Sequence, residues 1–316
     1  MKNNLPKILF GLFIIGLVIF SIYILYKDSN KNETNTTSQT EIEPQIVNDL
    51  RLGIAEFDTL NPILSNNKNV QEIGKLIYEP LVTISKDYKV EGCLATEWSI
   101  IDNNAYLIKL RENIVFHDGS KFTAKDVKFT IDKIKDENIT SIYKNNLKDV
   151  INAEIIDEYT IKLFLNSSIP FFEYNLTFPI LSENYYLNQD FVTTSKNQNP
   201  VGTGKYKVSA HEQEKILLKQ NQNYWNNANQ AENNSYGIHT ISVFLYSSMG
   251  EVYNAFKIGN IDLIHTNNSN FEEYIGTLGY NKKEYKGRQY DYIALNCNSE
   301  VLSNLEVRKA ISYAID

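Results

Sequence analysis

From about residue 50 onward, apolar residues recur with two different periods, and each period predicts a different kind of element. Val70, Ile73 and Ile77 are spaced as on one face of a helix, and Pro80 ends that helix because it supplies no N–H. Alternation of apolar and polar residues instead predicts strands. The expected strands cover residues 51–56, 106–110, 160–165, 216–218 and 239–246. Because strands and helices interleave, the expected fold class is α/β, or α+β with mixed sheets.

Start signals predict further helices. Thr123 with Asp126 forms a capping box ahead of an apolar stripe, and residues 249–258 show helical spacing. Ser303 with Glu306 is expected to form a second capping box, before the last helix. That helix carries an apolar stripe that needs a partner surface, and little sequence follows to supply one. We therefore expect a fragment, or a product truncated in nature.

The amino end determines the expected compartment. The run from Ile8 to Tyr26 is apolar and uncharged, and at about 1.5 Å per residue it matches the ~30 Å hydrocarbon thickness of a bilayer. Lys2 and Lys7 precede it, which predicts that the amino end stays in the cytoplasm. No small-residue cleavage site follows, so an uncleaved anchor is favoured over a signal peptide. We expect residues 1–27 to be a membrane anchor and residues 28–48 a flexible linker.

Composition narrows the function classes. The net charge of −7 disfavours binding of nucleic acid, which requires a concentrated basic surface. Cys93 and Cys297 stand far apart and outside any metal-binding spacing, so a zinc site is not expected. Two buried free thiols are the favoured state of these cysteines, with a disulfide as the alternative. No metal and no cofactor is expected.

Two motifs have the appearance of chemical sites. The segment at 116–119 contains His117 and Asp118, but no second set of converging ligands is visible, so it is interpreted as a turn. Gly202 and Gly204 resemble a phosphate loop, yet Tyr206 stands where the loop requires Ser or Thr. They form either a plain turn or one whose backbone approaches a ligand or a hinge. No catalytic nucleophile motif is present, so no catalytic residue is assigned and an enzyme is not expected.

Four groups of segments, taken in order, resemble one protein family. They are LNP at 60–62 with IYEPL at 77–81; LATEW at 94–98 with LRENIVFHDG at 110–119 and FTAKDV at 122–127; PVGTGKY at 200–206 with NYW at 223–225; and LN at 295–296 with EVRKAISYAID at 306–316. Their order and spacing are similar to extracellular solute-binding protein family 5, the oligopeptide, dipeptide and nickel binders of ATP-driven (ABC) importers.

The resemblance implies a periplasmic-binding-protein-like type II fold, with two lobes that close on a ligand about a hinge. Residues 49–270 would form the first lobe, with an extra subdomain at about 70–190. Residues 271–316 would form the hinge crossover and the start of a truncated second lobe.

The resemblance also implies contacts with a ligand at particular positions. Glu56 matches a carboxylate that faces the cleft, and the other positions lie at the edge of the first lobe, at the crossover or in the glycine turn. The full set is Glu56, Asn267, Asn268, Tyr292, Asn296, Gly202 and Gly204. An extended peptide could pair with the main chain there, which gives affinity without strict sequence choice.

The function implied is that of an extracytoplasmic receptor that captures oligopeptides and passes them to an ABC permease and its ATPase. The folded part would lie outside the cell membrane, attached through the amino-terminal helix. Three alternatives remain open: a membrane-anchored peptide sensor or adhesin with the same fold, a surface hydrolase, and a non-functional truncated remnant. The residues do not identify the ligand.

Overall fold

The computed structural model describes residues 48–102, 104–226, 237–266, 280–285, 287 and 292–315. The expected anchor and linker, together with Asn267 and Asn268, lie outside these ranges. Among the described residues, no helix combines the length and the apolar character needed to cross a bilayer.

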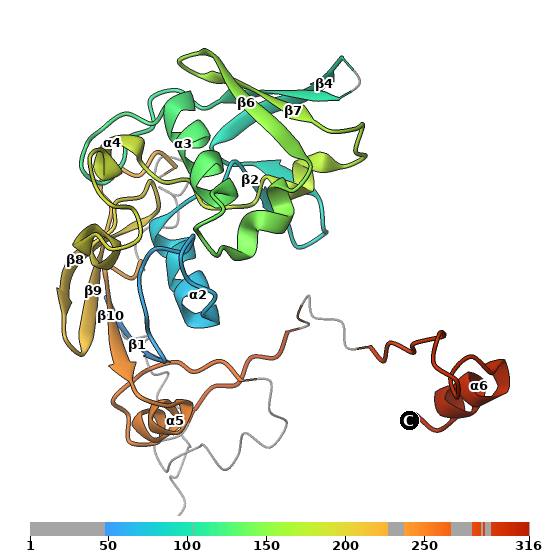
Figure 1. Cartoon of the computed structure of the whole chain (residues 1–316). Helices are drawn as coiled ribbons and strands as arrows, with labels where there is room; N and C mark the ends of the chain where they lie inside the picture. The colour runs from blue at the N-terminus through green and yellow to red at the C-terminus, as the bar shows by residue number, and fades with distance from the viewer. Residues whose placement is uncertain are drawn as a thin grey trace, which may run out of the picture.

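The first sheet contains four strands and brings together distant parts of the chain. Its order is β1 (Asp49–Ala55), β10 (Thr240–Tyr246), β9 (Lys215–Gln220) and β8 (Tyr206–Glu212). The pair β1 and β10 is parallel, whereas β10 with β9 and β9 with β8 are antiparallel. Figure 1 shows β1 beside β10, although the two strands come from opposite ends of the described body. The sheet is therefore mixed, as the sequence predicts.

The second sheet is antiparallel throughout and forms the upper part of the body in Figure 1. Its strand order is β4 (Ala95–Ile101), β5 (Ala105–Leu110), β7 (Thr160–Leu165) and β6 (Val150–Asp157). The helix α3 (Ala124–Lys135) packs against β6 and β7. One face of this sheet is therefore covered, and the short hairpin of β2 (Val82–Ile84) and β3 (Val90–Gly92) precedes β4.

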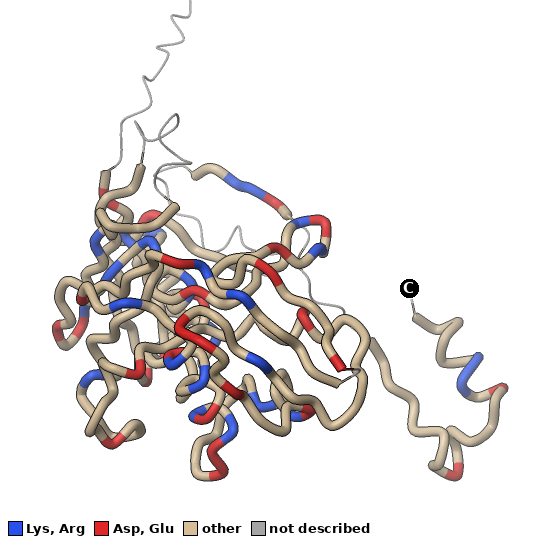
Figure 2. Tube along the Cα trace, turned by 90° about the horizontal axis from the view of Figure 1, so that it is seen from above, with Lys and Arg blue, Asp and Glu red and all other residues tan. Residues whose placement is uncertain are grey.

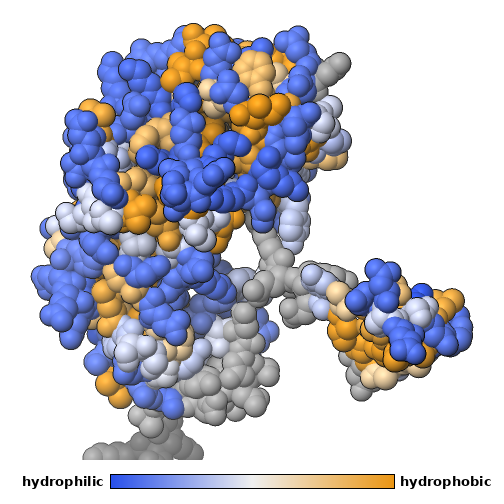
Figure 3. Space-filling model, in the orientation of Figure 1, coloured by the Kyte–Doolittle hydropathy of each residue, from blue (hydrophilic) through white to orange (hydrophobic). Residues whose placement is uncertain are grey.

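The remaining helices connect the two sheets or flank them. They are α2 (Lys68–Ile77), α4 (Glu183–Tyr186), α5 (Met249–Lys257) and α6 (Leu305–Tyr313), with 3₁₀ turns η1 (Ile142–Leu147), η2 (Phe172–Asn175) and η3 (Ser195–Gln198). In α2 the buried residues are Val70, Ile73, Gly74 and Ile77, which is the face that the apolar spacing predicts. No residue of α6 is buried within the described structure, and Figure 3 shows apolar surface around this helix.

One large core joins the second sheet, α2, α3 and the inner positions of the first sheet. Among its fully buried side chains are Tyr78, Phe116, Phe122, Phe172 and Phe178. A smaller cluster lies under α5, where Ala55, Val252, Ala255 and Ile261 are buried together. Removing this apolar surface from water is the main force that holds the two sheets in place.

The structure confirms most of these expectations and corrects two. The capping box of Thr123 and Asp126 is present, and Cys93 and Cys297 are both free. Cys93 is buried as expected, but the expected burial of Cys297 is wrong, because this residue is exposed. The expected capping box at Ser303 is wrong. Asn304 caps α6 by accepting a hydrogen bond from the N–H of Glu306, because the helix begins one residue later than the sequence suggests.

Candidate ligand-binding site

The carboxyl ends of β1 and β10 form one edge of the first sheet. The two strands are parallel, and their last paired residues are Ala55 and Tyr246. Two helices begin close to these strand ends in the sequence, α2 after its cap Asn67 and α5 after its cap Ser248. In sheets with parallel strands, ligands bind in the crevice outside the carboxyl ends, where backbone turns and helix N-termini meet. This edge is therefore the first candidate for a binding site.

Glu56, the predicted cleft carboxylate, lies at this edge in an uncommon backbone conformation. Its φ of 57° is in the left-handed region, which costs a residue with a side chain about 1–2 kcal/mol. The turn is held by the beginning of α2: Asn67 Nδ2 donates to the carbonyl of Glu56 at 2.5 Å, and Asn69 Nδ2 donates to that of Ala55 at 3.0 Å. The Glu56 residue is exposed, so its carboxylate is available to a ligand.

The chain after Glu56 is fixed by polar side chains. Asp58 Oδ1 accepts hydrogen bonds from the N–H of Thr59 and from Ser65 Oγ, both at 2.8 Å. Asn61 is fully buried, accepts from the N–H of Ile63 at 3.0 Å and donates to Asn197 Oδ1 at 2.9 Å. The LNP motif therefore ties this loop to a segment more than a hundred residues later.

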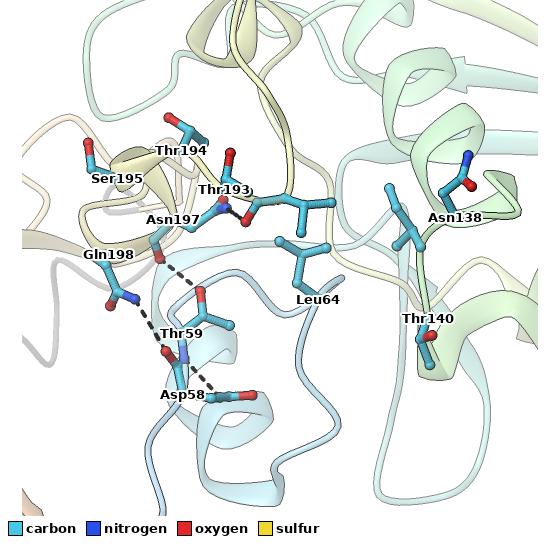
Figure 4. Close-up of a pocket in the computed structure, with 12 residues that line it drawn as sticks. Asp58, Thr59, Leu64, Asn138, Thr140, Thr193, Thr194, Ser195, Asn197 and Gln198 are labelled. Carbon is cyan, nitrogen blue, oxygen red and sulfur yellow. Dashed lines mark hydrogen bonds between the residues drawn. The ribbon is translucent and has the colours of Figure 1, made fainter.

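A pocket of about 530 Å³ opens beside this loop. Three separate segments line it, as Figure 4 shows: the loop after β1, the segment that follows α3, and the chain that leads into η3. Its lining residues are Asp58, Thr59, Leu64, Asn138, Ile139, Thr140, Val192, Thr193, Thr194, Ser195, Asn197 and Gln198. The volume lies within the range of small-molecule sites in proteins. None of these residues was among the contacts expected from sequence.

Gly202 and Gly204 lie buried against the end of α2. A Cβ atom added to Gly202 would be 2.0 Å from the carbonyl oxygen of Ile77, and one added to Gly204 would be 2.6 Å from the carbonyl carbon of Ile77. The N–H of Gly204 donates to that carbonyl oxygen at 2.8 Å. Only glycine permits this approach of two backbones. The described contacts of both glycines are made with the chain itself, and their contact with a ligand stays a prediction.

His117 connects the glycine turn to the turn at 116–119. The N–H of Gly202 donates to His117 Nδ1 at 3.2 Å, and His117 Nε2 donates to the carbonyl of Gly204 at 2.9 Å. Both ring nitrogens are thus used by a neutral imidazole. Burial lowers the pKa of His117 from 6.5 to about 4, against the smaller raising effect of the Gly204 carbonyl. The interpretation of this segment as a structural turn agrees with these contacts.

Glu79 of the IYEPL motif is a buried carboxylate, only 7% exposed. Its Oε1 accepts from the hydroxyl of Tyr224 at 2.9 Å, and its Oε2 accepts from Trp225 Nε1 at 3.0 Å. The guanidinium of Arg111 stacks over the Trp225 ring, 4.2 Å from its centroid. Burial raises the pKa of Glu79, and the hydrogen bonds from Trp225 and Tyr224 oppose that rise. The sequence analysis identified the motifs at 77–81, 110–119 and 223–225 but did not predict that their side chains are in contact.

The other predicted contacts are not brought to the pocket. Tyr292 is 75% exposed and Asn296 is exposed, and neither lines the pocket. Asn296 Oδ1 accepts from the N–H of Asn298 at 3.0 Å, so it caps a local turn. Of the expected positions within the described residues, Glu56 alone lies next to the pocket-lining loop.

These features define the class of the molecule. The fold, with its mixed parallel and antiparallel sheet, is that of the two-lobed periplasmic binding proteins of type II. The family model described as "Bacterial extracellular solute-binding proteins, family 5 Middle" matches residues 89–316, which is more than half of the chain. The chain therefore belongs to family 5 of the bacterial extracellular solute-binding proteins, the substrate-binding components of ABC importers.

Individual relatives show the range of ligands associated with this fold. The glutathione-binding protein GsiB of Escherichia coli K12 is 26% identical over 281 residues, which covers 83% of this chain and 51% of the relative. The structure of NikZ from Campylobacter jejuni in complex with Ni(L-His) matches with a TM-score of 0.66 and 26% identity, over 85% of this chain and 53% of that one. The oligopeptide-binding protein AppA from Bacillus subtilis, in complex with a nonapeptide, matches with a TM-score of 0.61 and 22% identity, over 72% and 45%. The chain spans about half the length of the curated relatives it matches.

Proposed function

We propose that this protein is the extracytoplasmic substrate-binding component of an ABC importer, which captures oligopeptides between two lobes and delivers them to a membrane permease. The observation that carries the proposal is the family match across residues 89–316. It is supported by the carboxyl edge of β1 and β10, where the strained turn at Glu56 leads directly into the pocket-lining loop. In this proposal the chain performs no covalent chemistry and acts by binding alone.

The division into lobes belongs to the same proposal. Residues 49–270 form the first lobe, with an extra subdomain at about 70–190 that contains the second sheet. Residues 271–316 form the hinge crossover and the beginning of the second lobe. Closure of one lobe on the other would bring a second set of contacts to a ligand at the carboxyl edge of the first sheet.

Peptides are the proposed ligands because of what the similar proteins bind. One is described as glutathione-binding and one was solved with a nonapeptide. An extended peptide can pair with exposed main-chain groups, and side-chain pockets then adjust the preference. A third similar protein was solved with Ni(L-His), so a metal complex of an amino acid is the ligand to test beside peptides.

We further propose that residues 1–27 anchor the protein in the cell membrane and that residues 28–48 tether the folded part on the outer side. The support is the uncharged apolar run from Ile8 to Tyr26, preceded by Lys2 and Lys7. An anchored chain stays in the membrane fraction after washing at high pH and is released by detergent. Release by the alkaline wash would contradict the anchor.

Titration calorimetry with the full chain in detergent tests the receptor proposal. A pool of di- to hexapeptides, glutathione, and Ni²⁺ with L-histidine are added in separate runs, each with a thermal melt. Saturable heat and a raised melting temperature are expected with peptides, because a ligand that binds only the folded state stabilises it. Binding of Ni²⁺ with L-histidine and not of peptides would replace the peptide proposal, and no response to any ligand would refute the receptor.

A variant at the carboxyl edge sharpens the test. Glu56→Asn removes the carboxylate and retains a residue type that tolerates the left-handed conformation, so the turn should persist. We expect peptide binding to weaken several-fold with little change in melting temperature. The matched control is Glu97→Gln in β4, an exposed carboxylate whose ion pair with Lys109 lies on the second sheet. Equal affinity in both variants and the parent would remove Glu56 from the site.

A further inference from the structure

The pocket beside the loop after β1 is lined by uncharged residues and a single carboxylate. Among its twelve lining residues Asp58 is the only ionisable side chain, and the rest are hydroxyl, amide or aliphatic residues. Figure 2 shows acidic and basic residues interspersed along the chain trace of the whole body. The charge of the ligand group that the pocket prefers is therefore set by the residues that line it, because the rest of the molecule does not present a surface of one charge sign.

Several side-chain donors of the pocket are already used inside the protein. Asn197 Nδ2 donates to the carbonyl of Phe191 at 2.8 Å, and Gln198 Nε2 donates to that of Asp58 at 3.2 Å, as Figure 4 shows for the latter. The remaining bonds of this kind run from Thr59 Oγ1 to the carbonyl of Asn197, from Thr194 Oγ1 to Gln189 Oε1 and from Asn138 Nδ2 to Asp136 Oδ1. A ligand that accepts hydrogen bonds would find these donors engaged.

The pocket also offers a carboxylate oxygen as an acceptor. Asp58 Oδ1 is held by Thr59 and Ser65, which fixes the carboxylate, and within the described residues Oδ2 accepts no hydrogen bond. Gln198 Oε1 also has no donor in the described part of the chain, but it is buried and out of a ligand's reach. Because Asp58 is the only ionisable residue of the lining, the ligand group that suits the pocket is a hydrogen-bond donor with a positive charge.

The aliphatic lining and the position of the pocket fit such a group. Leu64, Ile139 and Val192 supply apolar wall against which the methylene stem of a basic side chain can pack while its charged end stays near Asp58. Asp58 follows Glu56 by two residues, so the pocket adjoins the carboxyl edge of β1.

We propose that this pocket is the subsite for a cationic nitrogen group of the ligand, an ammonium or a guanidinium, and that Asp58 carries the selection. The inference rests on the proposed function, because it names the ligand chemistry of the same receptor. It predicts that peptides carrying a basic group at this subsite are preferred over matched acidic peptides. Salt should weaken that preference, since the carboxylate is exposed to solvent.

Calorimetry with four tripeptides tests this: Ala-Lys-Ala, Ala-Glu-Ala, Ala-Ala-Ala and its N-acetylated form, each titrated into the full chain. The variant is Asp58→Asn, whose Oδ1 can still accept from Thr59 and Ser65, so the loop retains its bonds. Asp49→Asn at the beginning of β1 is the matched control for lost surface charge. For a side chain in the subsite, we expect Ala-Lys-Ala to bind about five- to tenfold more tightly than Ala-Glu-Ala, and the preference to disappear in Asp58→Asn but not in Asp49→Asn.

The four peptides also separate the two sources of the charge. If the subsite takes a basic side chain, Asp58→Asn weakens Ala-Lys-Ala alone. If it takes the amino terminus, the variant weakens every unacetylated peptide and leaves the acetylated one unchanged. Peptide binding that is identical in the parent and Asp58→Asn refutes the inference and leaves the receptor standing. If the folded chain binds neither these four peptides nor the larger ones, both the proposed function and the subsite are refuted.

Discussion

His117 should make the protein lose stability in mild acid, and the size of the effect follows from its environment. In the folded state the neutral ring accepts from the N–H of Gly202 and donates to the carbonyl of Gly204. The pKa of His117 is about 4 in the fold, against 6.5 for the free side chain. Between these values the unfolded chain binds a proton that the folded chain excludes, so the free energy of unfolding falls as pH drops from 6.5 toward 4. At 1.36 kcal/mol per pH unit the loss amounts to about 3 kcal/mol.

The variant His117→Gln isolates this contribution. Gln cannot titrate and bridges the two glycines less well, so at pH 7 it should be less stable by about 1–3 kcal/mol. The measurement is urea unfolding of both proteins from pH 4 to pH 7.5, followed by the fluorescence of Trp98 and Trp225. Other titrating groups contribute equally to both proteins and cancel in the difference. The difference in stability should therefore shrink as pH falls from 6.5 to 4, where the parent has lost its advantage.

A neighbouring substitution provides the control. Phe116→Leu removes buried volume from the same turn without changing a titratable group, and should cost about 1 kcal/mol at every pH. A parallel offset is expected for this variant and a converging one for His117→Gln. A constant difference between the parent and His117→Gln from pH 4 to 7.5 would show that the ring is not held neutral by the glycine turn, and the reasoning would fail.

Two further predictions concern buried contacts of the same region. Burial raises the pKa of Glu79, so the folded state binds its proton more tightly, and the contribution of this group to the free energy of unfolding falls as pH rises above 4.5. In urea unfolding, Glu79→Gln should therefore gain stability relative to the parent between pH 4 and pH 7. A variant that instead loses stability relative to the parent over this range would contradict the sign. Gly202→Ala forces a Cβ against the carbonyl oxygen of Ile77 and should destabilise the fold by more than about 3 kcal/mol. The control Gly119→Ala, at a φ of 86° with open space around it, should cost only about 1–2 kcal/mol. Equal melting temperatures of these two variants would refute the steric argument.

The strand β7, which has one buried face, was predictable, whereas β6 and β4, which lack one, were not. In β7 every second residue is buried, and the predicted range of 160–165 is the observed one. In β6 the pairing with β7 is interrupted by two register irregularities, and only Val150 and Ala153 are buried. The strand β4 likewise shows no regular alternation of buried and exposed positions, so periodicity gave no signal for either strand.

The candidate site was predictable only in part. Glu56 could be placed next to the end of the first strand from the sequence, and family resemblance marked it as a cleft residue. The pocket could not be placed, because its walls come from three distant segments. Gln198 reaches the carbonyl of Asp58 across 140 residues of sequence, and Asn61 reaches Asn197 across 136. No local spacing encodes such pairs.

The sequence by itself determined the protein family, the mixed fold class and the helix cap at Thr123, because these depend on residue spacing or on bonds that span three or four positions. The tertiary structure decided which polar groups are buried and which remain available. It placed Gly202 against Ile77, enclosed Glu79 between Tyr224 and Trp225, and fixed Oδ1 of Asp58 through Thr59 and Ser65. The physical reason is that a donor or acceptor acquires its partner from whatever the fold packs beside it, and that neighbour is fixed only when distant segments meet.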